Sequence, residues 1–116
     1  MAKINKNNQN LVLLINNLKK LSNQENVKIW KSVAKNLEKS NSRKSVVNLS
    51  KINKYSRDKE TVVVPGKVLG DGELTKDVKV AAFQFSETAK EKLKNRLSIE
   101  ELMKQNPKGK NTRIIA

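Results

Sequence analysis

Cysteine and histidine are both absent from the 116 residues of this sequence. Their absence excludes disulfide bonds, cysteine nucleophiles, zinc sites built from Cys and His, and any Ser-His-Asp arrangement. An enzyme with this composition would have to use Asp, Glu, Lys, Tyr or Ser alone. The lack of cystines also argues against a small secreted domain, because such domains are commonly held together by disulfides.

Long hydrophobic segments are missing as well. The longest nearly apolar run near the N-terminus covers residues 11–15 and stops at Asn16. A membrane-spanning helix needs about 20 apolar residues, and a signal peptide needs about 7–15 before a small-residue cleavage site. We therefore expect a soluble, cytoplasmic protein that has no membrane partner.

Acidic residues are few, with 11 Asp and Glu against 25 Lys and Arg, so the formal net charge is +14. Small soluble domains more often carry a net charge of about 2–8 in magnitude. The surplus is spread over loops, candidate helices and both ends of the chain, although residues 1–60 hold the larger share. This distribution favours broad contact with the phosphates of a nucleic acid over base reading by one helix.

The hydrophobic pattern predicts one domain over residues 1–116, of the α/β class. Residues 1–8 are expected to form a loose basic arm, and residues 9–39 to form two helices with apolar positions at helical spacing. A capping-box pattern from Ser22 to Glu25 predicts the start of the second helix. Residues 40–45 read as a polar, basic loop.

Residues 46–116 alternate between short strand and helix patterns. Strands are predicted over residues 46–49, 61–64, 78–85 and 112–115, and Pro65 is expected to stop the second of them. One helical turn is expected after Ser50 and a longer helix from Ser86 through Leu97. A last short helix is expected from Ser98, ended by residues 106–107.

The glycine-rich segment over residues 65–72 lacks the Gly-Lys-Ser/Thr ending of a Walker loop and the Gly-x-Gly-x-x-Gly fingerprint of a dinucleotide site. It is either a turn between strands or a loop whose backbone and Lys67 touch phosphates. Glu100 and Glu101 are adjacent and point about 100° apart on a helix, so they do not converge. We expect no catalytic site, no metal site, no cofactor and no small-molecule substrate.

Aromatic residues number four. Trp30 lies in the apolar stripe of the second predicted helix and is expected in the core. Phe83 and Phe85 are two residues apart on a predicted strand, which places them on one face, and core packing is favoured over base stacking. Tyr55, beside Lys54 in the sequence, is the best candidate for an exposed aromatic contact.

Five segments carry a resemblance to a known family: residues 47–55, 61–74, 80–89, 98–102 and 113–115, including the runs Val-Val-Val-Pro-Gly-Lys-Val-Leu-Gly-Asp-Gly and Phe-Ser-Glu-Thr-Ala. The chain resembles the large-subunit ribosomal proteins of archaea and eukaryotes called "eighteen-e", relatives of the bacterial large-subunit protein "fifteen". Its short form is similar to the archaeal members. Relatives often carry more Arg before the first strand, where this chain has Arg43 and Lys44.

The resemblance implies a non-enzymatic structural protein of the ribosome that binds large-subunit rRNA beside neighbouring ribosomal proteins. It implies an irregular superhelix of β-β-α turns with two N-terminal helices. A DNA-packaging or chromatin protein is the alternative. That alternative explains the charge equally well but does not explain the valine- and glycine-rich segment, and no wedge residues for bending DNA are evident.

Candidate RNA contacts combine basic residues, polar neighbours and glycines through which the backbone could approach phosphates. Among them, Lys51, Lys54 and Arg57 are spaced three apart, which would place them on one face of a helical turn while Ile52 faces the core. The full predicted set is Lys3, Lys6, Arg43, Lys44, Lys51, Asn53, Lys54, Tyr55, Arg57, Gly66, Lys67, Gly70, Gly72, Lys108, Lys110 and Arg113.

Overall fold

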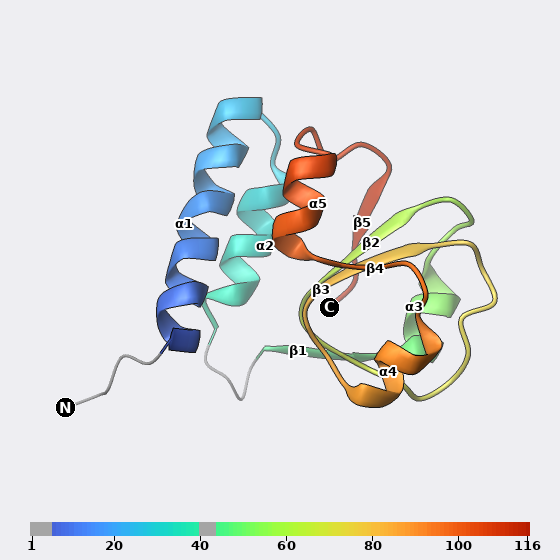
Figure 1. Ribbon diagram of the computed structural model, residues 1–116. Helices are drawn as coiled ribbons and strands as arrows, with labels where there is room; N and C mark the ends of the chain where they lie inside the picture. The colour runs from blue at the N-terminus through green and yellow to red at the C-terminus, as the bar shows by residue number, and fades with distance from the viewer. Residues whose placement is uncertain (1–5, 40–43) are drawn as a thin grey trace.

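The computed structural model describes residues 6–39 and 44–116. Two N-terminal helices precede a parallel sheet with interleaved helices, which confirms the α/β class (Figure 1). The elements are, in chain order, α1 (Lys6–Glu25), α2 (Ile29–Leu37), β1 (Ser45–Asn48), α3 (Leu49–Tyr55), β2 (Thr61–Leu69), β3 (Lys79–Phe85), α4 (Glu87–Lys92), β4 (Arg96–Ser98), α5 (Ile99–Gln105) and β5 (Thr112–Ile114).

Strand β2 is the centre of the sheet. It pairs with β3 on one side, and β3 pairs with β4. Its other side is shared, because β5 pairs with residues 61–63 and β1 with residues 66–69. All of these pairings between described residues are parallel. Parallel neighbours need a crossover between them, and residues 70–78 make the crossover from β2 to β3 without a helix.

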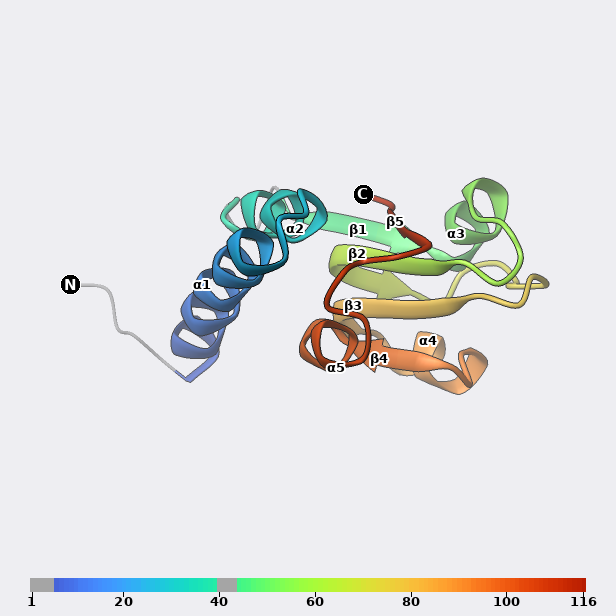
Figure 2. The same cartoon turned by 90° about the horizontal axis from the view of Figure 1, so that it is seen from above.

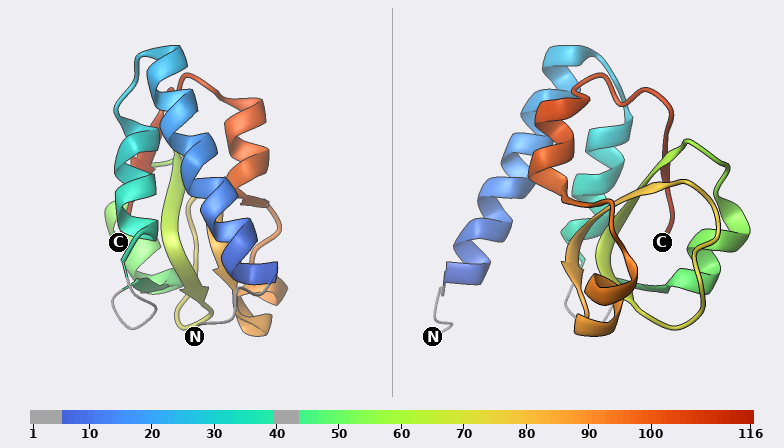
Figure 3. Two further views of the ribbon diagram at one scale, coloured as in Figure 1. Left: turned by 90° about the vertical axis from the view of Figure 1, so that its left-hand side faces the viewer. Right: turned by 45° about the vertical axis from the view of Figure 1, so that its right-hand side comes forward.

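The sheet is buried on both faces. Val62 and Val64 pack with α3 and α4 in one hydrophobic cluster, whereas Val63 packs with α1, α2 and α5 in a second cluster. All three valines are fully buried, because successive residues of a strand point to opposite faces and both faces are covered. Figure 2 shows the helices on the two sides of the sheet, and the left view of Figure 3 shows α2, α1 and α5 together on one of them.

The turn between α1 and α2 differs from the prediction. Helix α1 continues through Ser22 to Glu25, so the capping box predicted there is wrong. Ser22 is buried, and its hydroxyl donates to the carbonyl oxygen of Val27 across the turn. No side chain in the described part of the chain caps α2. Helix α1 also begins at Lys6, inside the predicted arm, while residues 1–5 lie outside the described residues.

Strand β2 passes through Pro65 and Gly66, so the prediction that Pro65 stops the strand is wrong. The register with β3 shifts between Val64 and Lys67, where β2 holds one more residue than β3. Such a bulge tolerates proline, because the residue inserted there needs no ladder hydrogen bond. The strand therefore turns slightly at this point and continues to Leu69.

Phe83 and Phe85 pack against different hydrophobic clusters, so the expectation that they share a face is wrong. The change of side falls where the register between β2 and β3 shifts, and a bulge increases the local twist of the strands. Both side chains are half-buried.

Helices α4 and α5 begin where they were predicted to begin, but α4 ends earlier than predicted. Helix α4 ends at Lys92 and not at Leu97, which lies in β4. Its cap is Ser86, whose hydroxyl accepts a hydrogen bond from the Ala89 N–H at 3.1 Å. The predicted capping box between Ser98 and Glu101 is present in full, and α5 ends at Gln105, before residues 106–107, as expected. No helix in residues 6–39 or 44–116 is long and apolar enough to cross a membrane.

Candidate nucleic-acid interface

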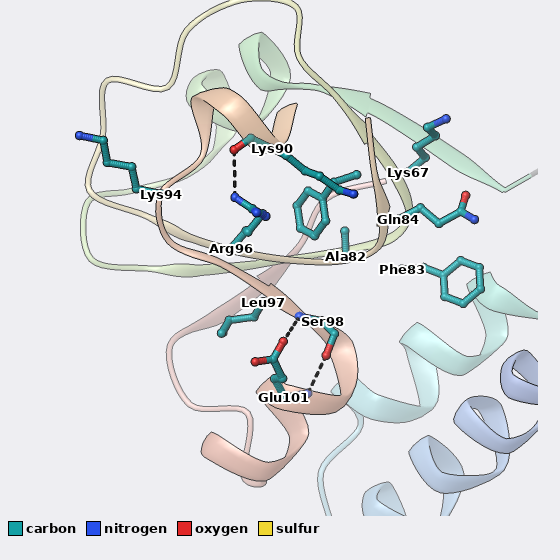
Figure 4. A pocket seen from close by; sticks show the side chains of 11 residues that line it. Lys67, Ala82, Phe83, Gln84, Lys90, Lys94, Arg96, Leu97, Ser98 and Glu101 are labelled. Carbon is teal, nitrogen blue, oxygen red and sulfur yellow. Dashed lines mark hydrogen bonds between the residues drawn. The ribbon is translucent and has the colours of Figure 1, made fainter. Parts of the chain in front are cut away.

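An open hollow of about 810 Å³ lies beside the C-terminal half of β3 and all of β4. Four basic side chains from different elements line it (Figure 4). Lys67 comes from β2 and Lys90 from α4, while Lys94 lies in the connection that leads to Arg96 at the start of β4. The hollow therefore concentrates positive charge that is scattered over the sequence.

The packing of the chain directs Lys67 away from the core and holds Arg96 in place. Lys67 is exposed between Gly66 and Val68, which are buried, so its side chain must point away from the core. The Nη1 atom of Arg96 donates to the carbonyl oxygens of Lys90 at 2.9 Å and Leu93 at 3.0 Å. A cation at the carbonyl end of a helix is favoured by the orphan carbonyls and by the helix dipole. Arg96 is thus held at the edge of the hollow.

A second hollow of about 550 Å³ continues from the first, with which it shares Lys67, Phe83 and Gln84 among its lining residues. It adds Lys44, whose Nζ lies 5.7 Å from the centroid of the Phe83 ring. We call the two hollows together the basic trough. Its cations are Lys44, Lys67, Lys90, Lys94 and Arg96.

Two acidic groups also line the basic trough. Glu101 accepts a hydrogen bond from the backbone N–H of Ser98 at 3.0 Å, and Glu100 lies beside it on α5. The hydrogen bond from the Ser98 backbone, followed by that of the Ser98 hydroxyl, lowers the pKa of Glu101 below its ordinary value. This carboxylate is therefore charged at neutral pH and held in place by the helix cap.

The predicted cluster on α3 is only partly a helical face. Lys51 and Lys54 lie on α3 with Ile52 buried between them, as expected, but Asn48 and not Ser50 is the residue before the helix. The helix ends at Tyr55 because Ser56 is extended, so Arg57 does not share its face. That part of the prediction is wrong.

Individual side chains on α3 have partners within the protein. The Nζ of Lys51 donates to the carbonyl oxygen of Ala116 at 2.7 Å. The Nζ of Lys54 lies 5.3 Å from the centroid of the Tyr55 ring, which is 52% exposed. Asn53 accepts hydrogen bonds from the backbone and hydroxyl of Thr75, so it ties α3 to the crossover that follows β2.

Arg113 is paired with a carboxylate. Its Nε lies 3.0 and 3.1 Å from the two carboxylate oxygens of Glu60, whose side chain is only 12% exposed. The side-chain hydrogen bond from Arg113 is the main cause that lowers the pKa of Glu60, and the same bond raises the pKa of Arg113. The pair joins β5 to the residue before β2, so Arg113 has a structural role whether or not it touches RNA.

Lys108 and Lys110 are exposed in the turn between α5 and β5. The amide of Asn106 closes this turn by donating to the Lys110 carbonyl at 2.7 Å and accepting from the Lys110 N–H at 3.2 Å. Gly109 has φ of +63° and leaves no room for a Cβ beside Ile29. The two lysines are therefore presented by a well-bonded turn.

The glycines of the predicted phosphate loop make room for this chain's own atoms. A Cβ on Gly66 would lie 2.0 Å from the Ser45 carbonyl oxygen, and one on Gly70 would lie 2.5 Å from the Thr88 side chain. Gly72 is exposed, with φ of +91°, and faces Ser50. Each glycine thus has an internal packing reason, and the phosphate contacts expected of them stay predictions.

The structure brings three of the predicted contacts, Lys44, Gly66 and Lys67, into the basic trough. The sequence reasoning missed Lys90, Lys94 and Arg96. A signal for them exists, because basic residues recur at every second position over residues 90–96. Lys3 and Arg43 lie outside the described residues. Lys6 is the first residue of α1, and its side chain is not among those described.

A strongly basic α/β protein with a positively charged trough has the physical properties of proteins that bind a polyanion such as a nucleic acid. Comparison with known proteins gives the class directly. The family model described as "Ribosomal protein 60S L18 and 50S L18e" matches residues 1–116.

Individual relatives agree over nearly their full lengths. The chain is 47% identical to large ribosomal subunit protein eL18 of Methanothermobacter thermautotrophicus over 119 residues, covering 99% of this chain and 98% of that protein. It is 48% identical to the eL18 protein of Archaeoglobus fulgidus (95% and 97% covered) and 45% identical to that of Methanococcus maripaludis (100% of each). These relatives are all archaeal, as the resemblance implied.

The chain belongs to the eL18 family of large-subunit ribosomal proteins. It is a structural constituent of the ribosome and not an enzyme, which confirms both predictions.

Proposed function

We propose that the protein binds large-subunit rRNA through the phosphate backbone, with the basic trough as its main contact. The observation that carries this proposal is the convergence of five cations from separate segments on the two adjoining hollows of the basic trough, in a chain of net charge +14. Phosphate contact supplies most of the affinity of such proteins and releases the counterions of the RNA.

Further contacts come from the predicted residues outside the trough. Lys54, Tyr55 and Arg57 are exposed at and after the end of α3, and Lys108 and Lys110 are exposed in the turn between α5 and β5. Lys3, Lys6 and Arg43 belong to the same proposal. Together these groups let one domain touch several RNA segments and hold them in a fixed relation.

Neighbouring ribosomal proteins are the second class of partner in this proposal. Val12 and Leu13 on α1 are 56% and 59% exposed, which is unusual for large apolar side chains next to each other. We propose that this part of α1 lies against another protein of the subunit.

The β-β-α superhelix implied by the resemblance is supported by one succession of this kind in the chain, β2–β3–α4.

Two measurements test the proposal. In a sucrose gradient of a cell extract, the protein should migrate with the large subunit at near-stoichiometric amounts. For an rRNA fragment, log affinity should fall linearly with log salt, with a slope of about −4 to −9 for roughly 6–10 phosphate contacts. Migration with chromatin would instead support the DNA-packaging alternative, and a flat salt dependence would contradict phosphate binding.

A matched pair of triple variants tests whether the RNA phosphates contact the basic trough. Replacing Lys67, Lys90 and Lys94 by Ala should reduce the salt slope by about 2–3. The control replaces Lys31, Lys35 and Lys104, which are exposed lysines outside the trough. The control lowers the net charge equally and should leave the slope closer to that of the unchanged protein. Equal effects of both variants would contradict a main contact at the trough.

A further inference from the structure

We propose that the basic trough accepts one unpaired nucleotide of the RNA, with its phosphate beside Lys67, Lys90 and Lys94 and its base against Phe83 and Gln84. This inference rests on the proposed RNA binding, and it goes further by naming the local form of the RNA at this site.

The shape of the site favours an unpaired nucleotide over a duplex. The backbone of a duplex is convex, and an even basic surface is enough to contact it, whereas the larger hollow here is an open depression of about 810 Å³. That volume falls within the roughly 300–1,000 Å³ of sites that enclose a small organic group. The bases of an RNA helix are hard to reach, but unpaired bases can be splayed out and placed on aromatic side chains.

The phosphate end is defined by lysines that have room for a ligand. Among the described residues, neither Lys67 nor Lys94 has a side-chain hydrogen bond or an ion pair, and Lys90 has only an exposed contact with Glu87 at 3.5 Å. An exposed pair of this kind contributes little. Figure 4 shows Lys90 and Lys94 at the side of the hollow away from Ser98 and Glu101. The charge of Glu101 at the other end directs a phosphate toward the lysines.

The base end is defined by two adjacent residues of β3. Phe83 lines both hollows and is anchored from behind, because it packs against the cluster formed with α1, α2 and α5. Gln84 is exposed, and its amide offers both a donor and an acceptor, which matches the edge of a base.

The two ends are joined by the register of the sheet. Lys67 on β2 and Gln84 on β3 are paired residues of neighbouring strands. Neighbouring strands lie about 4.8 Å apart, so a phosphate at Lys67 and a base edge at Gln84 are within the reach of one nucleotide. The sheet itself therefore holds the two parts of the site at a fixed spacing.

The test compares three probes on the full chain: a single-stranded RNA pentanucleotide, a blunt RNA duplex and a poly-glutamate peptide. Fluorescence anisotropy at one fixed salt concentration gives the affinities. The pentanucleotide should bind at least about tenfold more tightly than poly-glutamate, because stacking adds to charge attraction. On titration, NMR signals of the Gln84 side-chain amide and the Phe83 ring should shift with the pentanucleotide and not with the duplex.

Variants separate base contact from charge. Gln84→Ala should weaken pentanucleotide binding about fivefold and duplex binding less than twofold, while Gln105→Ala, an exposed glutamine outside the trough, should change neither. Phe83→Leu should weaken pentanucleotide binding about five- to tenfold. Because Phe83 also packs on the core, the thermal unfolding of the Phe83→Leu variant is first compared with that of the unchanged protein. If Phe83→Leu is unstable, the result for Gln84→Ala decides whether the base is bound.

The outcomes distinguish this inference from the proposed function. Duplex binding with a normal salt slope, together with no effect of Gln84→Ala on the pentanucleotide, overturns the nucleotide site and leaves phosphate binding standing. Equal affinity for poly-glutamate and the pentanucleotide also overturns it. If the unchanged protein binds neither RNA, both proposals are wrong.

Discussion

The indole Nε1–H of Trp30 donates a hydrogen bond to the carbonyl oxygen of Pro107 at 2.7 Å, across 77 residues of sequence. Trp30 is fully buried in α2, and Pro107 follows α5. The bond joins the N-terminal helical pair to the last turn of the chain, so the two ends of the fold depend on each other. A buried indole needs such a partner, because its N–H would otherwise lose its hydrogen bond to water.

Trp30→Phe should destabilise the protein by about 1–3 kcal/mol, because the Pro107 carbonyl loses its donor and a smaller ring leaves space in the core. Urea unfolding followed by far-UV circular dichroism measures the change, since the variant has no tryptophan. The exposed-site control Lys31→Ala should stay within about 0.5 kcal/mol of the unchanged protein. Equal stability of Trp30→Phe would show that the bond contributes nothing.

The Glu60–Arg113 pair should make stability depend on pH in the acidic range. The pKa of Glu60 is lowered in the folded protein, mainly by the hydrogen bond from Arg113. The stabilisation is therefore present above the ordinary pKa of about 4.5 and is lost as pH falls through the lower folded-state pKa. Glu60→Gln should unfold at lower urea concentration than the unchanged protein at pH 7, and the difference should shrink below pH 4.5.

The matched control for Glu60 is Glu87→Gln, because the Glu87 side chain is 88% exposed and, within residues 6–39 and 44–116, its one ion pair is with Lys90. This change should alter stability little at either pH. A gap between Glu60→Gln and the unchanged protein that keeps its full size below pH 4 would contradict the titration of Glu60 as its cause.

Gly66→Ala should destabilise the pairing of β1 with β2. The new Cβ would lie 2.0 Å from the Ser45 carbonyl oxygen, which belongs to the backbone and cannot turn aside. Overpacking of this kind costs about 1–3 kcal/mol and occasionally more. Lys67→Ala, at the next, exposed position, should change stability by no more than about 0.5 kcal/mol. Hydrogen exchange at β1 amides should rise in Gly66→Ala alone, and unaltered exchange would contradict the predicted clash.

The triple change Lys51→Ala, Lys54→Ala and Arg57→Ala tests the contact predicted after Ser50. All three side chains are exposed, so the fold should survive. Incorporation into large subunits should drop, and the salt slope for an rRNA fragment should shrink by up to about 2–3 units. Unchanged incorporation with an unchanged slope would remove this segment from the RNA-binding surface and leave the basic trough as the main contact.

Local sequence patterns predicted the secondary structure correctly wherever a residue and its near neighbours in the chain determine it. Apolar spacing predicted the two N-terminal helices and placed Trp30 in the core, and the pairing of Ser98 with Glu101 predicted the start of α5 correctly. The same kind of pattern misled at Ser22, because a buried serine can bond across a turn as well as cap a helix. Only the packing of α1 on α2 distinguishes these two uses.

The sequence by itself determined the class of the protein: the absence of Cys and His excludes several kinds of catalytic and metal site, the charge favours a polyanion partner, and the valine- and glycine-rich segments mark the family. Tertiary structure decided where that charge acts. Lys44, Lys67 and Arg96 are far apart in the chain and meet around one trough because parallel strands align residues from distant segments. The same alignment carries β2 through Pro65, because the neighbouring strands supply the hydrogen bonds and the burial that outweigh the local preference of proline to end a strand.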